Sequence, residues 1–241
     1  VVILAAGKGT RMRSQRAKVL HPLAGRALIQ HVVDAAAPLE PRNLAIVVGH
    51  QAEDVQAYLG DGPLWVHQEQ QQGTGHAVKL AMDKLPGDGV VLVLYADVPL
   101  VSQFTLAQAL EAAEQGSVGL VTAEFLDPAE LGRIVRDRDG NIASIVEFKD
   151  ASDKQRAIRE INSGIMAVPA ERLQGWLAEV APHNAQGEYY LTDIIAMAVR
   201  DGVEVKGVQA AQPEEVTGVN DRVQLAELER IYQRSEAHRL M

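Results

Sequence analysis

Short apolar runs alternate with helical patterns along the first 125 residues, and this alternation constrains the fold more than any other feature. The first run, Val1 to Ala5, predicts a buried strand, and similar runs predict strands over 44–48, 90–95 and 118–123. Apolar residues at helical spacing predict helices between these strands, over 28–37, 51–59, 75–85 and 103–114. Strands joined by helices form right-handed crossovers, so we expect an α/β fold with a Rossmann-like, doubly wound, mostly parallel sheet.

The pattern changes after residue 125, where two runs flank Asp139 and Gly140. This pair favours a hairpin turn, so we expect an antiparallel insertion built from 133–137 and 142–148. Later patterns predict strands over 162–168 and 204–208 and helices over 170–177 and 189–199. A last helix begins at Asp221, and its apolar stripe weakens toward Met241, so we expect it to form an arm that projects from the domain.

The composition excludes several classes of protein. The chain has 23 basic and 32 acidic side chains, and its net charge of −9 argues against a nucleic-acid partner. It has no cysteine, which excludes disulfide scaffolds, thiolate zinc sites and cysteine nucleophiles. No apolar stretch approaches the roughly 18 residues of a membrane span, so we expect a cytoplasmic protein without a membrane partner. Because the chain begins inside an apolar run and without methionine, we expect it to be part of a longer protein.

A glycine loop follows the first strand in the motif L-A-A-G-K-G-T-R-M, residues 4–12. Backbone amides in such a loop, beside Lys8 and Arg11, can form a nest for a phosphate. Met12 replaces the third glycine of the dinucleotide fingerprint, and the Gly-Lys-Ser/Thr of the Walker motif is absent. The alternative is a bare turn whose charged side chains are simply solvated. Lys18 argues against it, because together with Arg11 it could contact a triphosphate from two sides.

Asp97 directly follows the most apolar of the predicted strands. Open α/β sheets bind their ligands at the carboxyl ends of their strands, and a carboxylate there suits Mg²⁺, which needs few protein ligands when phosphates and water complete its octahedron. A helix cap is the alternative role for Asp97, although Ser102 is better placed to cap the helix that follows. We therefore expect a magnesium site at this edge of the sheet.

The segment from Gln68 to His76 is polar and carries two glycines before a predicted helix. Its amides and hydroxyl could hydrogen-bond the edge of a nucleobase, although the spacing alone is a weak signal. The histidines never fall within four residues of each other, so no zinc motif of the H-E-x-x-H kind is present. No serine lies in a G-x-S-x-G elbow, which argues against a serine triad.

Motifs along the whole chain resemble those of nucleoside-triphosphate-dependent sugar-1-phosphate nucleotidyltransferases. Besides residues 4–12, they are A-K-V-L-H at 17–21, Q-G-T-G-H-A at 72–77, L-Y-A-D-V-P-L at 94–100, I-V-E-F-K-D at 145–150, E-I-N-S-G-I at 160–165, N-A-Q-G-E-Y-Y-L-T-D at 184–193 and G-V-N at 218–220. Together they are similar to the N-terminal uridyltransferase domain of the bacterial bifunctional N-acetylglucosamine-1-phosphate uridyltransferase and glucosamine-1-phosphate acetyltransferase family. The resemblance implies transfer of uridylyl from UTP to N-acetylglucosamine-1-phosphate, with Mg²⁺ as cofactor.

The resemblance also implies which residues bind the nucleotide. Contacts with the nucleotide would come from Leu4, Ala5, Ala6 and Gly7. Lys18 would bind the phosphates, and Arg11 would act on the leaving pyrophosphate. Uracil would be held by Gln68, Gly73 and Thr74.

The other implied residues concern the sugar and the metal. Contacts with the sugar and phosphates would come from Tyr95, Ala96 and Asp97. The N-acetylglucosamine pocket would be lined by Gly132, Glu147 and Asn162. Mg²⁺ would be held by Asp97 and Asn220.

Three positions depart from the commonest form of the family: Ala17 replaces a proline, Ala96 a glycine and Leu131 a tyrosine. The extra methyl group of Ala96 would crowd the sugar if the backbone approaches it closely. Ala17 leaves the chain before Lys18 freer than a proline would. We expect these departures to affect substrate affinity and not the class of reaction.

The resemblance implies a uridyltransferase domain over 1–220, with a nucleotide-binding half over 1–125 and a sugar-binding half over 126–220. Residues 221–241 would be a linker helix toward an acetyltransferase β-helix domain, which would give the full-length protein a second activity on glucosamine-1-phosphate. No hexapeptide repeat of such a β-helix is visible in this chain. We expect the full-length protein to be a homotrimer and this portion to be monomeric.

Two other functions stay open at this stage. The first is a thymidylyl or cytidylyl transferase of the same fold, because the uracil preference rests on resemblance alone. The second is a binding protein that has lost turnover, against which Arg11, Lys18, Asp97 and Asn220 argue.

Overall fold

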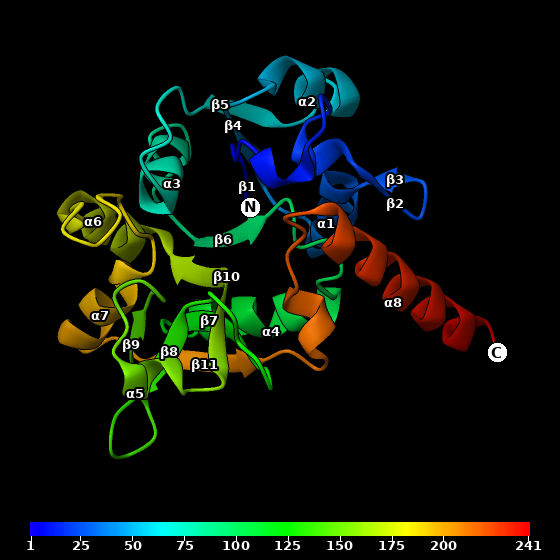
Figure 1. The fold of residues 1–241 in the computed structure, drawn as a ribbon. Coiled ribbons are helices and arrows are strands. Elements are labelled where there is room, and N and C mark those ends of the chain that lie inside the picture. The colour runs from blue at the N-terminus through cyan, green and yellow to red at the C-terminus, as the bar shows by residue number, and fades with distance from the viewer.

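The computed structural model describes residues 1–241 and centres on one nine-stranded sheet (Figure 1). Seven strands form its main path, in the order β11, β7, β10, β6, β1, β4, β5. Their bounds are β1 (Val2–Ala5), β4 (Ala45–Val48), β5 (Leu64–His67), β6 (Val90–Tyr95), β7 (Val118–Glu124), β10 (Glu160–Pro169) and β11 (Val205–Gln209).

The sheet is mostly parallel, as the alternation of strands and helices predicts. β1 pairs in parallel with β4 and β6, β4 with β5, and β11 with β7. Only β10 runs antiparallel along this path, between β6 and β7. The expected hairpin is also present, because β8 (Arg133–Arg136) pairs antiparallel with β9 (Ile142–Val146), and β8 meets β10 at Arg133 and Ile161.

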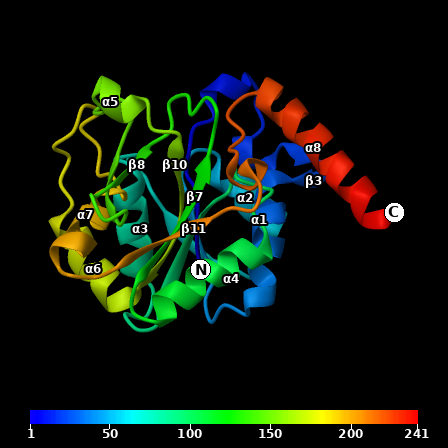
Figure 2. The ribbon, with the colours of Figure 1, turned by 90° about the horizontal axis from the view of Figure 1, so that it is seen from below.

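Helices cover both faces of the sheet (Figures 1 and 2). Their bounds are α1 (Leu28–Ala36), α2 (Ala52–Leu59), α3 (Thr74–Met82), α4 (Gln103–Glu114), α5 (Asp153–Arg156), α6 (Ala170–Glu179), α7 (Asp193–Arg200) and α8 (Arg222–Leu240). Successive side chains of a strand point to opposite faces, so Val2 and Leu4 pack with α3, α6 and α7, while Ile3 and Ala5 pack with α1, α2 and α4. This two-sided burial explains why β1 is continuously apolar.

Short two-stranded and helical pieces complete the chain. A small ribbon joins β2 (Pro22–Leu23) to β3 (Arg26–Ala27). Single helical turns lie at η1 (Thr10–Met12), η2 (Lys18–Leu20), η3 (Ala37–Leu39) and η4 (Pro213–Val216). None of the helices combines the length and the apolar character needed to cross a bilayer.

Two predicted caps are confirmed. The Ser102 hydroxyl accepts a hydrogen bond from the backbone N–H of Thr105 at 3.1 Å and so begins α4. The Asp221 carboxylate accepts hydrogen bonds from the N–H groups of Val223 and Gln224 and begins α8. Of the residues in α8 only Leu228 is buried, and the helix projects from the body of the molecule toward its C-terminal end (Figure 2).

The ribbon of β2 and β3 and the short helix α5 were not predicted, and two further elements differ from the sequence expectation. The edge strand β5 was not predicted, because only Val66 of its four residues is buried and the apolar pattern is correspondingly weak. The helix expected over 189–199 begins only at Asp193. Tyr189 lies outside the helix because its backbone bonds another segment: its N–H donates to Gln72 O and its carbonyl oxygen accepts from Gly75 N, both at 2.8 Å. Leu191 and Thr192 form a turn that leads into α7.

The contact between β7 and α4 predicts a large effect for one small substitution. A Cβ on Gly119 would lie 2.1 Å from the carbonyl oxygen of Ala109, so Gly119→Ala forces the strand and helix apart. We expect it to lower the free energy of unfolding by about 2 kcal/mol or more in urea denaturation. The matched control is Gly175→Ala in α6, where no atom lies within 4 Å of the new Cβ. We expect that change to raise stability by about 0.5–1 kcal/mol, and equal stabilities of the two variants would refute this packing argument.

Candidate active site

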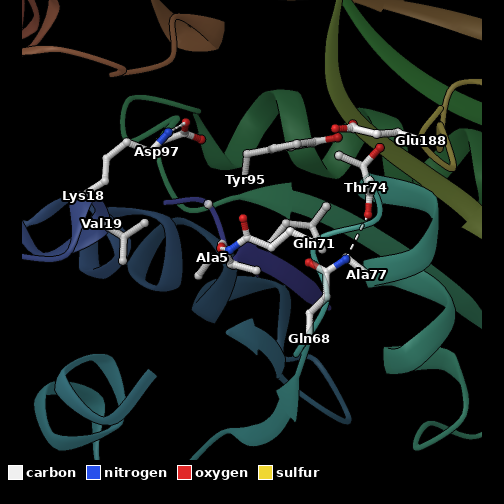
Figure 3. Close-up of a pocket in the computed structure, with 14 residues that line it drawn as sticks. Ala5, Lys18, Val19, Gln68, Gln71, Thr74, Ala77, Tyr95, Asp97 and Glu188 are labelled. Carbon is white, nitrogen blue, oxygen red and sulfur yellow. Dashed lines mark hydrogen bonds and ion pairs between the residues drawn. The ribbon is translucent and has the colours of Figure 1, made fainter. Parts of the chain in front are cut away.

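A cavity of about 250 Å³ opens at the carboxyl ends of β1 and β6 (Figure 3). Its walls come from the loop after β1, the segment that leads from β5 into α3, and the end of β6. The lining residues are Leu4, Ala5, Ala6, Gly7, Lys18, Val19, Gln68, Gln71, Gly73, Thr74, Ala77, Tyr95, Asp97 and Glu188. This edge of an open α/β sheet is where such folds bind their ligands.

The structure therefore brings most of the residues singled out for the nucleotide into one cavity, together with Tyr95 and Asp97. Four further lining residues were missed, namely Val19, Gln71, Ala77 and Glu188. Gln71 and Ala77 lie within or beside the polar segment that the sequence points to, and Glu188 lies in the motif at 184–193. Their side chains carried no separate signal, because only the fold shows which members of a motif face the same space.

One end of the cavity carries a cation between two oxygen atoms. Lys18 Nζ donates to Asp97 Oδ2 at 2.5 Å and to Asn220 Oδ1 at 3.3 Å. The side chains of Lys18 and Asp97 are only 12% and 18% exposed, so this pair is shielded from much of the solvent. The backbone holds the arrangement together, since Val219 N donates to the carbonyl oxygen of Asp97 at 2.8 Å.

A glycine fixes the position of Lys18. Gly9 has φ +60°, and a Cβ at this position would lie 2.6 Å from Lys18 Cβ. The left-handed backbone and the close approach both require glycine. The glycine loop thus serves, among other roles, to seat the lysine.

The opposite end of the cavity is lined by amides. The buried Gln68 side chain donates from Nε2 to the carbonyl oxygen of Gly73 at 3.0 Å, and this nitrogen also lies 3.1 Å from His76 Nδ1. Because the amide nitrogen is committed to a carbonyl oxygen, the orientation of the Gln68 carboxamide is defined, and its Oε1 accepts no hydrogen bond. Gln71 Nε2 donates to Ala6 O at 2.5 Å and ties this segment to the glycine loop.

The segment that leads into α3 is fastened from the other side as well. Thr74 Oγ1 accepts a hydrogen bond from Leu191 N at 3.1 Å. A Cβ on Gly73 would lie 2.6 Å from the carbonyl oxygen of Tyr189, so only glycine permits this approach. The segment before α7 therefore supports the amide-lined end of the cavity.

Tyr95 lines this cavity and also lies near a second group of polar residues. In Figure 3 its ring extends from the end of β6 toward Glu188. The ring packs on β10, where a Cβ on Gly164 would lie 2.5 Å from Tyr95 Cε2. Burial, together with the nearby charges of Glu147 and Asp97, raises the pKa of Tyr95 above its ordinary value. The phenol thus stays neutral under the influence of two carboxylates.

The second group surrounds the carboxylate of Glu147. Its Oε1 accepts a hydrogen bond from the Thr192 hydroxyl at 3.1 Å, and a Cβ on Gly132 would lie 3.3 Å from its Oε2. Asn162 N donates to Gly132 O at 2.9 Å, which brings Asn162 into the same group. Burial raises the pKa of Glu147, an effect that the Thr192 hydrogen bond opposes. Gly132, Glu147 and Asn162 are therefore clustered, beside the cavity rather than among its lining residues.

Two of the expected site residues lie elsewhere. Arg11 is exposed on η1, and its side chain makes no hydrogen bond. Ala96 is fully buried in the hydrophobic core, and its N–H donates to Leu4 O, so it does not line the cavity. Its methyl group packs with core residues and is not available to crowd a ligand.

Ala17 has φ −51°, which suits the proline that it replaces.

Asp97 and Asn220 provide a donor set suited to a hard cation. The ammonium of Lys18 lies within hydrogen-bond distance of oxygen atoms from both residues, which shows that the two oxygens converge on one point. No group of three or more His, Cys, Asp or Glu side chains is arranged to hold a metal by itself. A metal at this point would therefore need a ligand that brings oxygen atoms of its own, as phosphates do.

Comparison with known proteins agrees with this geometry. The model of the MobA-like NTP transferase domain matches residues 1–161. The bifunctional protein GlmU of Alkalilimnicola ehrlichii is 54% identical over 98% of this chain and 51% of its own length. That of Neisseria gonorrhoeae is 52% identical over 100% of this chain and 52% of its own length. The chain thus spans about half the length of these relatives.

Solved structures show the same fold. A UDP-glucose pyrophosphorylase in complex with UDP-glucose covers 97% of this chain and is itself 98% covered, with TM-score 0.77 at 17% identity. A nucleotidyl transferase from Methanothermobacter thermautotroptrophicus gives TM-score 0.66 at 22% identity, with 97% of both chains covered. The expected fold and enzyme class are confirmed. The chain belongs to the family of MobA-like NTP transferase domains.

Proposed function

We propose that this chain transfers uridylyl from UTP to N-acetylglucosamine-1-phosphate, giving UDP-N-acetylglucosamine and pyrophosphate. The observation that carries the proposal is a single cavity with a cation site at one end and amide groups at the other, adjacent to the carboxylate of Glu147. These parts match a triphosphate, a base and a sugar in their chemistry. The similarity to GlmU proteins over the whole chain supports it.

The proposal extends to the longer protein. The relatives are named bifunctional proteins, and we infer that the full-length protein also acetylates glucosamine-1-phosphate, using residues outside this chain. We further infer a cytoplasmic enzyme, a homotrimer at full length, that supplies UDP-N-acetylglucosamine for peptidoglycan and lipopolysaccharide. Within this chain the proposed division stays at 1–220 for the transferase domain and 221–241 for a linker helix.

The free oxygen of Gln68 supports a base that carries a hydrogen-bond donor on its edge. Oε1 is a hydrogen-bond acceptor with no partner, and it needs a donor from any base that covers it. Uracil presents an N3–H at its pairing edge, and cytosine presents its C4 amino group there, so this oxygen can accept a hydrogen bond from either base. Thymine presents the same N3–H, so Gln68 does not distinguish it from uracil.

The charged end supports nucleotidyl transfer by neutralisation of charge. Phosphoryl-type transfer needs little covalent chemistry from a protein, because the reaction depends on in-line positioning and on stabilisation of phosphate charge. A phosphate oxygen of the sugar phosphate attacks the α-phosphorus of UTP, and the bond to pyrophosphate breaks. The nucleophile is already anionic, so no general base is required. Lys18 would leave Asp97 and bind the phosphates, while Arg11 would meet the leaving pyrophosphate.

The metal site fits the same reaction. We propose Mg²⁺ as the cofactor, held by Asp97 and Asn220, because hard oxygen donors and a phosphate ligand are what this ion prefers. When bound, the ion neutralises phosphate charge and helps to align the reacting groups.

The group around Glu147 would recognise the sugar through hydrogen bonds. Its carboxylate can accept hydrogen bonds from a hydroxyl or an amide N–H, and the Thr192 hydroxyl holds it in place. Asn162 and Gly132 support the same pocket. A buried acceptor discriminates strongly, because the wrong ligand leaves it without a partner.

Pyrophosphate release across a panel of substrates tests the proposed function. The panel pairs UTP, dTTP and CTP with N-acetylglucosamine-1-phosphate and glucose-1-phosphate, each with Mg²⁺. We expect the highest kcat/KM for UTP with N-acetylglucosamine-1-phosphate. A higher value with dTTP or CTP would assign a different transferase, and no release with any pair would indicate a binding protein.

Lys18→Ala tests the role of the buried ammonium. We expect kcat to fall on the order of 10²-fold or more, because one preorganised charge near the phosphates is lost. The control is Lys79→Ala on α3, an exposed lysine without a hydrogen bond, which should leave kcat unchanged. If Lys18→Ala raised only KM for UTP, Lys18 would be a binding residue without a role in the transition state.

Glu147→Ala tests the sugar pocket. We expect KM for N-acetylglucosamine-1-phosphate to rise on the order of 10-fold or more, with little change in the Kd of UTP measured by calorimetry. The exposed Glu171 on α6 gives a matched control, Glu171→Ala, with no effect on either value. Equal losses for both ligands would place Glu147 in the structural framework instead of the sugar pocket.

A further inference from the structure

The guanidinium of Arg222, at the start of α8, is bonded to the loop that follows β1. Arg222 Nε donates to the carbonyl oxygen of Met12 at 3.0 Å, and Nη2 donates to that of Arg13 at 3.1 Å. The partners are 210 and 209 residues apart in the sequence. In Figure 2 the beginning of α8 lies beside the first, blue segment of the chain.

The loop that Arg222 contacts has a strained backbone. The turn η1, Thr10–Met12, is flanked by two residues in the left-handed region, Gly9 with φ +60° and Arg13 with φ +48°. Glycine adopts this conformation freely, but arginine does so at a cost. Such a conformation persists only where the surrounding structure holds it.

Arg222 supplies part of that support. Carbonyl groups at the end of a helical turn lack partners within the turn, and a cation there is favoured by the direction of the peptide dipoles. The guanidinium occupies this position and binds the carbonyl of the strained residue itself. Apolar packing adds to the support, because Met12 is buried in one cluster with Val219 and Leu228.

The position of Arg11 depends on this support. Its side chain is exposed and makes no hydrogen bond, so the position of the side chain is set only by the backbone of η1 to which it is attached. The same C-terminal segment also holds the metal end of the cavity, since Val219 N bonds Asp97 O and Asn220 Oδ1 accepts from Lys18. The backbone of Arg11 is therefore fixed relative to Asp97 through residues 219–222.

We propose that Arg222 is a positioning residue that holds the loop so that Arg11 reaches the leaving pyrophosphate. This inference rests on the proposed function, in which Arg11 acts on that group. Arg222 does not line the cavity, and its hydrogen bonds to the loop go only to backbone carbonyls. Its effect is therefore exerted through the conformation of the loop and not through contact with substrate.

Kinetics of two Arg222 variants give the first test. We expect Arg222→Ala to lower kcat about 10-fold to 10²-fold, because a small displacement of a group that acts on the reacting phosphates is costly. KM for N-acetylglucosamine-1-phosphate should stay within about twofold, since the sugar pocket lies elsewhere. Arg222→Lys keeps the charge but can bind only one carbonyl well, so its kcat should be intermediate. Arg230→Ala, on the exposed surface of α8, is the control and should match the wild type.

A double-mutant cycle with Arg11 separates positioning from a general loss of structure. If Arg222 acts through Arg11, Arg222→Ala should cost little in kcat once Arg11→Ala is present. Additive losses in the double variant would overturn the proposal, because Arg222 would then act independently of Arg11.

Hydrogen exchange tests the loop without any substrate. The N–H groups of Met12 and Arg13 donate within η1, to Gly9 O and Thr10 O, and we expect both to exchange at least about tenfold faster in Arg222→Ala. Unchanged exchange would overturn the proposal. If the wild-type chain released no pyrophosphate from UTP, the proposed function and the role of Arg11 would be refuted instead. Hydrogen exchange would still show whether Arg222 holds the loop.

Discussion

The ion pair between Lys18 and Asp97 is the interaction on which the rest of the site depends. It joins η2, the helical turn that follows the glycine loop, to the end of β6, and Asn220 adds the segment before α8 to the same point. Because both charged side chains are largely shielded from solvent, their attraction is stronger than that of a surface pair, and removal of either would leave a poorly solvated charge. Three distant parts of the chain thereby meet at one cationic position.

The sheet provides the rigid frame for this meeting point. Parallel strands β1 and β6 deliver the glycine loop and Asp97 to the same edge. The antiparallel β10 then inserts beside β6, and its Gly164 leaves room for the ring of Tyr95. Tyr95 therefore lines the cavity and lies near the Glu147 group, and its ring packs on a strand from the later part of the chain that is built into the centre of the sheet.

Local patterns predicted much of the fold and less of the site. The apolar run at 90–95 coincides with β6, and Ser102 and Asp221 cap the helices that they were expected to begin. The central position of β10 could not be predicted, because strand order is set by long-range pairing. The pairing of Asp97 with Asn220 came from resemblance alone, and the bonds of Arg222 to the loop carried no local signal.

Calorimetry of UTP binding with and without Mg²⁺ tests the central claim most directly, because it measures whether metal and nucleotide meet at Asp97. We predict that Mg²⁺ strengthens UTP binding to the wild type by about tenfold or more, a coupling of ordinary size for two linked ligands. Asp97→Asn should lose this gain, whereas Asp83→Asn, an exposed aspartate next to α3, should keep it. The same Mg²⁺-dependent gain in Asp97→Asn and in the wild type would contradict the account.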